Sequence, residues 1–280
     1  MKKISRRSFL AASGLTIAAL ALTACGGSAS TASSAASSVA ASSEAASTSA
    51  AAAELTTVEA GKLTMATNAA FPPYEMTTDS GDFEGIDIET AQAIADKLGL
   101  ELQIDDMDFD AALLSVQQGK ADIAMAGVTV TDERKNVMDF SDSYATGIQS
   151  IIVPEGSDIA SPDDLAGKMI GTQRGTTGYI YCSDDFGDDA VVAYDDGLTA
   201  VQALNNGQVD AVVIDNAPAK EFVAANPGLV LLDTSYAEED YAIGMAKGNT
   251  ALEDAVNAAL EELKADGTLQ SIVDKYITAE

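Results

Sequence analysis

Two segments of the chain, 88 residues apart, carry the same pattern of residue types. ALLSVQQGKADIAMAG (112–127) aligns without gaps with AVQALNNGQVDAVVID (200–215). Three pairs of positions mark the match: Gly119 with Gly207, Asp122 with Asp210, and Gly127 with Asp215. Each segment predicts a helix that ends at a turn and is followed by an apolar strand. The repeat therefore predicts two similar lobes, each with a sheet strand that ends just before Gly127 or Asp215.

The rest of the folded part alternates between apolar strands and amphipathic helices. Strands are predicted over 62–67, 100–104, 122–126, 168–172, 210–214 and 241–245, and helices over 86–98, 111–118, 198–205 and 252–276. Two more helices are expected to start at Ser161-Pro162, with acids in the first turn, and after the turn Gly175–Gly178. This alternation indicates the α/β class with mostly parallel sheets. Ligands of such sheets bind at the carboxyl ends of the strands, so two facing edges predict a cleft.

The C-terminal strand and helices are expected to return to the first lobe. The first lobe is predicted to comprise 61–146 plus 243–280, and the second lobe 147–242. The chain then crosses between the lobes twice, near 145–150 and 239–243. Two crossings make a hinge that is suited to closure around a ligand.

Residues 1–24 have the features of an export signal, with Lys and Arg before an apolar stretch. The stretch is too short for a membrane-spanning helix, which is the alternative. Leu22–Cys25 resembles a bacterial lipobox, and this implies cleavage before Cys25 and lipidation of its thiol. The two adjacent arginines fit either the twin-arginine export motif or an ordinary signal. Residues 25–60, rich in Ser and Ala, then predict a flexible tether.

The chain is strongly acidic, with 44 Asp and Glu against 15 Lys and Arg, no His, and a net charge of −29. This excess argues against nucleic acid as a partner, because phosphates would find few cations. It also argues against docking of the folded part on anionic lipid. With Cys25 lipidated, Cys182 is the remaining thiol, so no intrachain disulfide is expected.

Arg134 stands out in this acidic chain. Outside the export signal, the only arginines are Arg134 and Arg174. Arg134 is predicted in the first turn of a short helix, where the helix macrodipole disfavours a cation. A rare guanidinium in such a position indicates a role in holding an anion. A surface ion pair with Asp132 or Asp139 is the alternative.

The stretch AGVTVTDERKNVMDFSDSY around Arg134 resembles the signature of the amino-acid-binding proteins of bacterial ABC importers, the solute-binding protein family 3. Four further stretches resemble the family in order and spacing: ATNAAFPPYE, MDFDAALLSVQQGKADIAMAG, GTQRGTTGY and VDAVVIDNAPA. The likeness covers nearly all of 62–280. It implies an α/β fold like that of type II periplasmic binding proteins, with two lobes, a two-stranded hinge and a ligand cleft between the lobes.

A free α-amino acid needs cationic and N–H donors for its carboxylate and acceptors for its ammonium group. Arg134 offers a planar, permanently charged donor pair. The backbone N–H groups of Thr129 and of Thr177, at a helix start, are further anion donors. Asp215, the Gly127 carbonyl and the Thr129 hydroxyl would accept from the ammonium. The resemblance implies these same roles, while a strand-end cap at Asp215 and a simple helix N-cap at Thr177 are the alternatives.

Four other positions bear on the ligand's side chain. The resemblance implies that the rings of Phe71 and Phe109 sandwich it, although either ring could belong to the core. Asn68 stands where many relatives that bind basic or amide side chains carry an acid, and Gln173 where some amide-binding relatives carry Lys. These two neutral amides favour a neutral polar ligand such as glutamine or cystine.

The resulting prediction is a monomeric transport receptor without chemistry of its own. It would be anchored to the outer face of the cell membrane through lipidated Cys25 and pass an amino acid to an ABC permease with a cytoplasmic ATPase. No metal or cofactor is expected. A cyclohexadienyl-dehydratase-like enzyme is an alternative, but it needs a general acid that a chain without His, and with an amide at Gln173, does not readily supply. A sensor subunit is the other alternative, and it would need a separate membrane partner.

Overall fold

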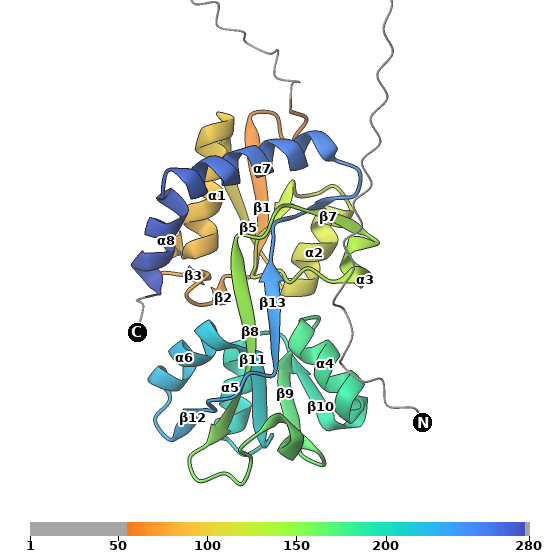
Figure 1. Cartoon of the computed structure of the whole chain (residues 1–280), viewed down its shortest axis with the longest axis vertical. Coiled ribbons are helices and arrows are strands. Elements are labelled where there is room, and N and C mark those ends of the chain that lie inside the picture. The colour runs from red at the N-terminus through yellow and green to blue at the C-terminus, as the bar shows by residue number, and fades with distance from the viewer. Residues whose placement is uncertain (1–54, 278–280) are drawn as a thin grey trace, which may run out of the picture. The chain divides into compact units, whose positions relative to one another are not determined.

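The computed structural model of the chain describes residues 55–277. Within them, two separate sheets and their covering helices form two lobes (Figure 1). The predicted export signal, the predicted lipidation position Cys25 and most of the predicted tether lie outside the described residues. No helix within 55–277 has both the length and the apolar character that crossing a bilayer requires.

The first lobe contains a five-stranded sheet in the order β5-β1-β6-β14-β7. Its strands are β1 (Lys62–Thr67), β5 (Glu101–Asp106), β6 (Ile123–Ala124), β7 (Met138–Phe140) and β14 (Gly244–Ala246). β1 is parallel to β5 and β6, whereas β14 is antiparallel to β6 and β7. The helices of this lobe are α1 (Ile86–Leu98), α2 (Phe109–Gln117), α3 (Asp132–Lys135), α7 (Thr250–Ala265) and α8 (Thr268–Tyr276). A small antiparallel sheet follows β1 and consists of β2 (Ala70–Phe71), β3 (Glu75–Thr77) and β4 (Phe83–Glu84).

The second lobe repeats this plan with the strand order β10-β9-β11-β8-β12. Its strands are β8 (Ala145–Pro154), β9 (Ile170–Gln173), β10 (Val191–Tyr194), β11 (Ala211–Asp215) and β12 (Leu229–Leu231). β9 is parallel to both β10 and β11, as β1 is to β5 and β6. The helices are α4 (Thr177–Phe186), α5 (Gly197–Asn205) and α6 (Asn216–Ala225), with a 3₁₀ turn at Asp188–Ala190. The predicted α/β class with two similar lobes is confirmed. The expectation of mostly parallel sheets is wrong, because β14 and β8 pair antiparallel with their neighbours and make both sheets mixed.

β8 and β13 connect the two lobes, as Figure 1 shows. β13 (Ala237–Tyr241) lies antiparallel to the first half of β8, with Ala237 opposite Gln149 and Tyr241 opposite Ala145. The second half of β8 belongs to the second sheet through β11 and β12. The predicted two-stranded connection is therefore present. The exact lobe limits stay a proposal: 61–146 with 243–280, and 147–242.

The internal repeat corresponds to equivalent local structure in the two lobes. The glycines that follow α2 and α5 have nearly the same positive φ, +66° at Gly119 and +67° at Gly207, a conformation that favours glycine. The next shared residue also acts alike, because Asp122 accepts a backbone hydrogen bond at β1 and Asp210 accepts one beside β9, each at 2.8 Å. The same residue types therefore form the same helix-to-strand turn twice.

Three expected elements differ from the structure. The helix expected at Ser161 is only a 3₁₀ turn, Pro162–Leu165, because the residue after it already has an extended backbone. The strand expected over 241–245 is split between the end of β13 and β14. The helical run 252–276 is divided into α7 and α8, because Gly267 between them has a φ of +80° that interrupts the helix.

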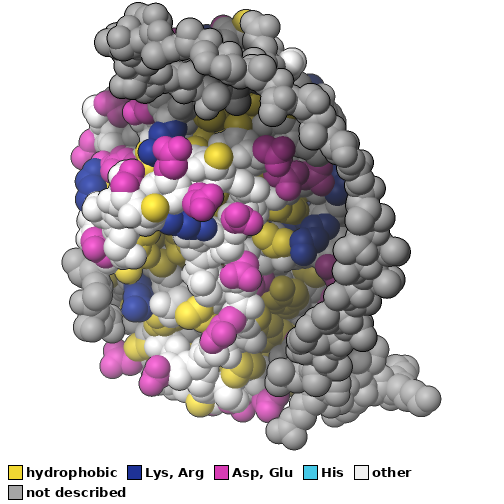
Figure 2. Space-filling model, turned by 45° about the horizontal axis from the view of Figure 1, so that its top comes forward, with side chains coloured by type: hydrophobic (Ala, Val, Ile, Leu, Met, Phe, Trp, Pro, Cys, Tyr) yellow, Lys and Arg dark blue, Asp and Glu magenta, His cyan; other side chains and the backbone are white. Residues whose placement is uncertain are grey.

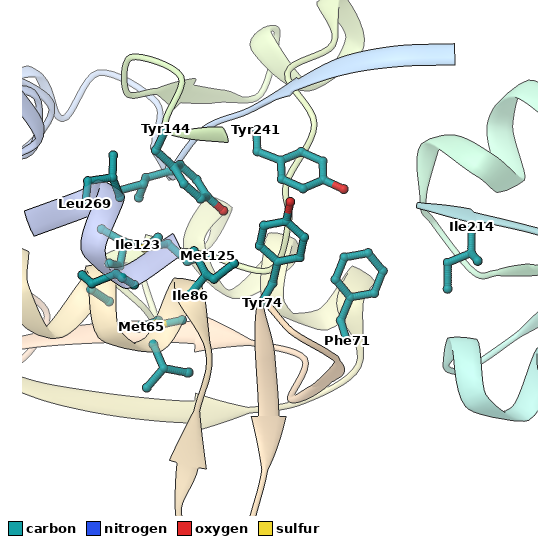
Figure 3. Close-up of a cluster of buried hydrophobic side chains, with 14 of the residues drawn as sticks. Met65, Phe71, Tyr74, Ile86, Ile123, Met125, Tyr144, Ile214, Tyr241 and Leu269 are labelled. Atoms are coloured by element: carbon teal, nitrogen blue, oxygen red, sulfur yellow. The ribbon is translucent and has the colours of Figure 1, made fainter. Parts of the chain in front are cut away.

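Aromatic side chains fill the core where the first lobe meets the hinge. Figure 3 shows Tyr241 and Tyr74 close together between Tyr144 and Phe71, with Ile214 of the second lobe beyond Phe71. The rings of Tyr74 and Tyr241 meet edge to face with centroids 5.3 Å apart, a favourable arrangement for aromatic pairs. This cluster places the ends of β11 and β13 beside the strands of the first lobe.

Acidic side chains dominate the charged groups on the visible face of the described residues, and Lys and Arg are fewer (Figure 2). The salt bridges involve surface groups such as Lys247 and Asp139, at 2.5 Å. Exposed pairs of this kind contribute roughly 0–1 kcal/mol each, so the fold depends on its apolar core rather than on them.

Candidate functional site

One cavity lies between the lobes and collects every ligand-contact residue that the sequence predicted. Its wall contains Asn68, Phe71, Glu75, Phe109, Ala126, Gly127, Thr129 and Arg134 from the first lobe, and Gln173, Thr176, Thr177 and Asp215 from the second. The free volume is about 10 Å³, which is the space of roughly one water molecule. The lobes and side chains must therefore move apart before a molecule as large as an amino acid can enter.

Arg134 reaches the cavity from α3, whose N-cap Thr131 accepts a hydrogen bond from the Arg134 backbone N–H at 3.1 Å. The guanidinium donates from Nη1 to the Thr129 carbonyl at 2.8 Å and from Nη2 to the Gly175 carbonyl at 3.1 Å. It also lies over the ring of Phe109, 5.3 Å from the centroid, within the range of a cation–π contact. These contacts fix the cation at the boundary of the two lobes.

The alternative of a surface ion pair is wrong for Arg134. Only 8% of its surface is exposed, and Asp139 pairs with Lys247 instead. Burial lowers the pKa of Arg134, and the neighbouring carboxylate of Glu239 opposes that shift. A buried guanidinium without a direct carboxylate partner is a strong site for an anion.

Asp215 lies at the end of β11, and hinge residues hold both of its carboxylate oxygens. The Tyr241 hydroxyl donates to Oδ1, and Gln149 Nε2 donates to Oδ2 at 2.8 Å. Burial raises the pKa of the Asp215 carboxyl to about 7, although the hydrogen bond from Tyr241 lowers it. Asp215 occupies the N-cap position of α6, but its side chain makes no capping bond, so the cap alternative is wrong.

Thr177 is the first residue of α4, and the capping side chain is that of Thr176, which accepts from the backbone N–H of Tyr179. The alternative that Thr177 is only a helix N-cap is therefore wrong. Its hydroxyl instead donates to Glu239 Oε2 at 3.0 Å, and the Thr129 hydroxyl donates to the same oxygen at 3.2 Å.

The two amides predicted at the side-chain end of the cavity bond to each other across the lobes. Gln173 Nε2 donates to Asn68 Oδ1 at 2.8 Å, while Asn68 Nδ2 donates to the Met107 carbonyl at 3.0 Å. Both amides are buried, as are the rings of Phe71 and Phe109. The end of the cavity between these residues is therefore neutral, polar and flanked by aromatic rings.

Gly127 could not carry a side chain at its position. Its φ is +55°, and a Cβ would lie 2.9 Å from Cε1 of Phe71. The Gly127 backbone N–H donates to Asp87 Oδ2 at 3.0 Å, and the Tyr144 hydroxyl donates to the same oxygen at 2.8 Å. The backbone of Gly127 is thereby held from behind by a buried carboxyl group.

Three further residues of the cavity wall, Glu75, Ala126 and Thr176, were not predicted from the sequence. Glu75 is fully buried next to Asp87, and burial raises the pKa of both carboxyl groups, that of Asp87 to about 6. A single acid in the otherwise apolar stretch AAFPPYEM is the sequence signal that could have identified Glu75. The hinge residues of this site were also missed, because no sequence pattern links them to the predicted contacts.

Within residues 55–277 no group of three or more Asp, Glu, His or Cys side chains is arranged to hold a metal ion. The cavity combines a cation, a carboxylate, hydroxyls and amides in a small buried space. Such a set can bind a small molecule that carries both an anionic and a cationic group.

Comparison with known proteins agrees with this chemistry. Residues 63–279 match the family model of the bacterial extracellular solute-binding proteins, family 3. The L-cystine-binding protein TcyJ of Escherichia coli (strain K12) is 33% identical over 226 residues, which cover 79% of this chain and 85% of that protein. The ABC transporter glutamine-binding protein GlnH of Bacillus subtilis (strain 168) is 34% identical over 202 residues, 71% of this chain and 74% of that one.

A solved structure of an ancestral arginine-binding protein bound to glutamine is also similar to this chain. The two share 40% sequence identity and superpose with a TM-score of 0.75. The match covers 79% of this chain and all of the other. The likeness therefore extends over both lobes and the hinge.

Proposed function

The chain belongs to the bacterial extracellular solute-binding proteins of family 3, and from this premise we propose that it captures a free L-α-amino acid between its lobes for an ABC importer. It would deliver the amino acid to a permease with a cytoplasmic ATPase. The relatives reported above are binding proteins, and we propose no chemistry for this chain either.

The observation that carries the proposal is the pairing of Arg134 and Asp215 in one buried cavity. Arg134 comes from the first lobe and Asp215 from the second, so opposite charges face the same small space. An α-amino acid carries a carboxylate and an ammonium group on one carbon and would satisfy both. The N-terminus of α4 at Thr177 and the Thr129 hydroxyl supply further polar contacts. Because these groups come from both lobes, binding would favour closure.

We propose that the side chain of the ligand is neutral and polar. Asn68 and Gln173 each offer a donor and an acceptor, and neither brings a charge that would pair with a charged ligand. Phe71 and Phe109 would hold the aliphatic part of the side chain. Glutamine and cystine both fit this description, and two of the relatives are named as glutamine-binding and L-cystine-binding proteins.

We further propose that the protein is an exported, monomeric lipoprotein. Residues 1–24 would be the signal peptide, Cys25 the lipidated residue and 25–60 the tether to the outer face of the cell membrane. An exported location agrees with the extracellular family to which the chain belongs. Mass spectrometry of the mature N-terminus tests the anchor, since an unmodified Cys25, or a mature chain that retains residues 1–24, would contradict it.

Isothermal titration calorimetry tests the ligand. The purified protein is unfolded and refolded to strip bound amino acid and then titrated with the common amino acids and cystine. Tight binding of a neutral polar amino acid supports the proposal, whereas the absence of heat from a folded sample would reject amino-acid binding. Exclusive binding of arginine or glutamate would keep the receptor function but contradict the neutral side chain.

The variant Asn68→Asp sharpens this test. It places a carboxylate at the side-chain end of the cavity, so the affinity for arginine should rise relative to that for glutamine. If the preference stays unchanged in a folded variant, Asn68 does not face the side chain of the ligand.

A further inference from the structure

Glu239 is a buried acid on the hinge strand β13, and only 7% of its surface is exposed. A single oxygen, Oε2, accepts three hydrogen bonds. They come from Thr177 Oγ1 at 3.0 Å, Gln149 Nε2 at 3.0 Å and Thr129 Oγ1 at 3.2 Å. The carboxylate thereby joins the first lobe, the second lobe and both hinge strands.

Glu239 does not belong to the wall of the ligand cavity. It lines a neighbouring cavity of about 460 Å³, and Thr129 lies in the walls of both. Any effect of Glu239 on a bound ligand is therefore indirect and passes through its neighbours, above all the hydroxyls of Thr129 and Thr177.

The contact with Glu239 decides which way these hydroxyls point. A threonine hydroxyl has one proton to donate and two lone pairs to accept with, whereas a carboxylate can only accept. Thr129 and Thr177 both use their proton on Glu239. What each hydroxyl can still offer to the cavity is a lone pair.

Glu239 is also linked to Asp215, which the second lobe contributes to the cavity wall. Gln149 Nε2 bridges the two side chains, at 3.0 Å from Glu239 Oε2 and 2.8 Å from Asp215 Oδ2. This side of the cavity therefore presents the Asp215 carboxylate and two hydroxyls that act as acceptors, with the Glu239 carboxylate behind them. These acceptors suit a positively charged group with several N–H bonds. Their side chains offer no hydrogen-bond donor to an anionic group at the same place.

We propose that Glu239 is a specificity-determining positioning residue that makes the site select ligands with a protonated α-amino group. By taking the protons of the Thr129 and Thr177 hydroxyls, it leaves acceptors for the ammonium group. A 2-hydroxy acid with the same side chain has, in place of the ammonium group, a single O–H donor without a positive charge. It should therefore bind less tightly. This inference rests on the proposed function, because it concerns the ammonium end of the same amino-acid site.

The test compares two ligands in the full-length protein by calorimetry. The probes are L-glutamine and the 2-hydroxy acid that carries a hydroxyl in place of its amino group. If the wild type binds another amino acid more tightly, the matching pair is used. Glu239→Gln should weaken amino-acid binding by about tenfold or more, the order expected for a hydrogen bond to a charged group, and leave 2-hydroxy-acid binding within about threefold. The preference for the amine then falls by about tenfold.

Glu238→Gln is the matched control, because it makes the same change one position away on the same strand, where the side chain is exposed. It should leave both affinities unchanged. If Glu239→Gln weakens both ligands equally, the residue has only a structural role and the proposal is overturned. If the wild type binds no amino acid at all, the proposed function itself has failed.

A second pair of variants keeps the proposal testable should Glu239→Gln not fold. Thr129→Val removes the hydroxyl and keeps the shape, and it should lower the preference for the amine in the same way. Thr129→Ser retains the hydroxyl and should retain the preference. Equal preference in the Val and Ser variants would overturn the role of the oriented hydroxyl.

Discussion

At the scale of single residues, Arg134 shows why one cation suffices for an anionic group. Its guanidinium has five N–H bonds, and the contacts to the Thr129 and Gly175 carbonyls use two of them. The ring of Phe109 covers one face. The cation is thus held rigidly in a low-dielectric space with donors left for a carboxylate, and little reorganisation is needed when one binds.

Replacing Arg134 by Ala should abolish measurable binding. Loss of a buried, hydrogen-bonded charge partner costs roughly 3–5 kcal/mol, or a factor of about 10² to 10³ or more in Kd. Arg174→Ala is the control, because that side chain is 54% exposed and pairs at the surface with Asp195. Calorimetry with the preferred amino acid compares the two variants, and near-native affinity in Arg134→Ala would refute the carboxylate assignment.

Binding should also depend on the ionisation of Asp215. Burial raises the pKa of this carboxyl to about 7, so it becomes neutral as the pH falls below that value. A neutral Asp215 attracts an ammonium group less, and Kd should rise by up to about tenfold per pH unit between pH 7 and pH 5. Titrations across this range measure the slope. The Asp215→Asn variant should bind the amino acid weakly, and its Kd should not change with pH in this range. A wild-type Kd that does not depend on pH would count against the role of Asp215.

At the scale of elements, the hinge strands β8 and β13 do more than join the lobes. β8 supplies Gln149 and β13 supplies Glu239 and Tyr241, and these three side chains contact Asp215 or the threonines of the cavity. The two strands can come this close to the site because Gly147 of β8 leaves space for the Tyr241 ring. Movement of the hinge is therefore coupled to the positions of residues that line the cavity.

Gly147→Ala should disturb both stability and binding. A Cβ at this position would lie 2.4 Å from the Tyr241 ring, which is fully buried. Overpacking of this kind costs roughly 1–3 kcal/mol, which thermal unfolding would detect as a lower Tm. Displacement of the ring also weakens its bond to Asp215, so affinity should fall. Thr146→Ala, at an exposed neighbouring position, should change neither quantity, and equal behaviour of the two variants would contradict the argument.

At the scale of the whole molecule, three buried acids with raised pKa values make stability depend on pH. Burial raises the pKa of Glu75, of Asp87 to about 6 and of Asp215 to about 7. The folded protein therefore binds more protons than the unfolded chain between about pH 4 and pH 7. Stability then decreases as the pH rises through this window and increases on acidification. The large negative net charge acts in the same direction, because acidification reduces self-repulsion.

We therefore expect the ligand-stripped protein to have a higher Tm at pH 5 than at pH 8, by several degrees. Each shifted proton contributes up to roughly 1.4 kcal/mol per pH unit within its own window. The pKa of some other carboxyl groups is lowered, as that of Asp139 is by its hydrogen bond with Lys247. The stabilisation from these ionised groups is lost only at more acidic pH, so it does not reverse the trend above pH 5. Asp87→Asn should flatten the dependence, and a lower Tm at pH 5 than at pH 8 would contradict the prediction.

Local patterns in the sequence were sufficient to predict the fold. Helical spacing over 86–98, the glycines at 119 and 207 and the repeat of 88 residues each depend on neighbouring residues only, and the structure confirms the helices, the turns and the two similar lobes. One prediction was wrong at Ser161, where a helix-start signal alone did not determine the length of the helix. Another was wrong at Gly267, where a single glycine divides a long helical pattern into two helices.

The candidate site, like the fold, has some features that the sequence predicted and others that only the structure revealed. The sequence alone determined which residues end the equivalent strands and that a rare arginine follows one of them, and all nine predicted contacts line one cavity. Only the tertiary structure decided that Glu239 takes the protons of two threonines and that Gln149 and Tyr241 hold Asp215. Thr129 and Glu239 are 110 positions apart. Such contacts depend on how the two lobes meet across the hinge, and no local pattern of residues encodes that.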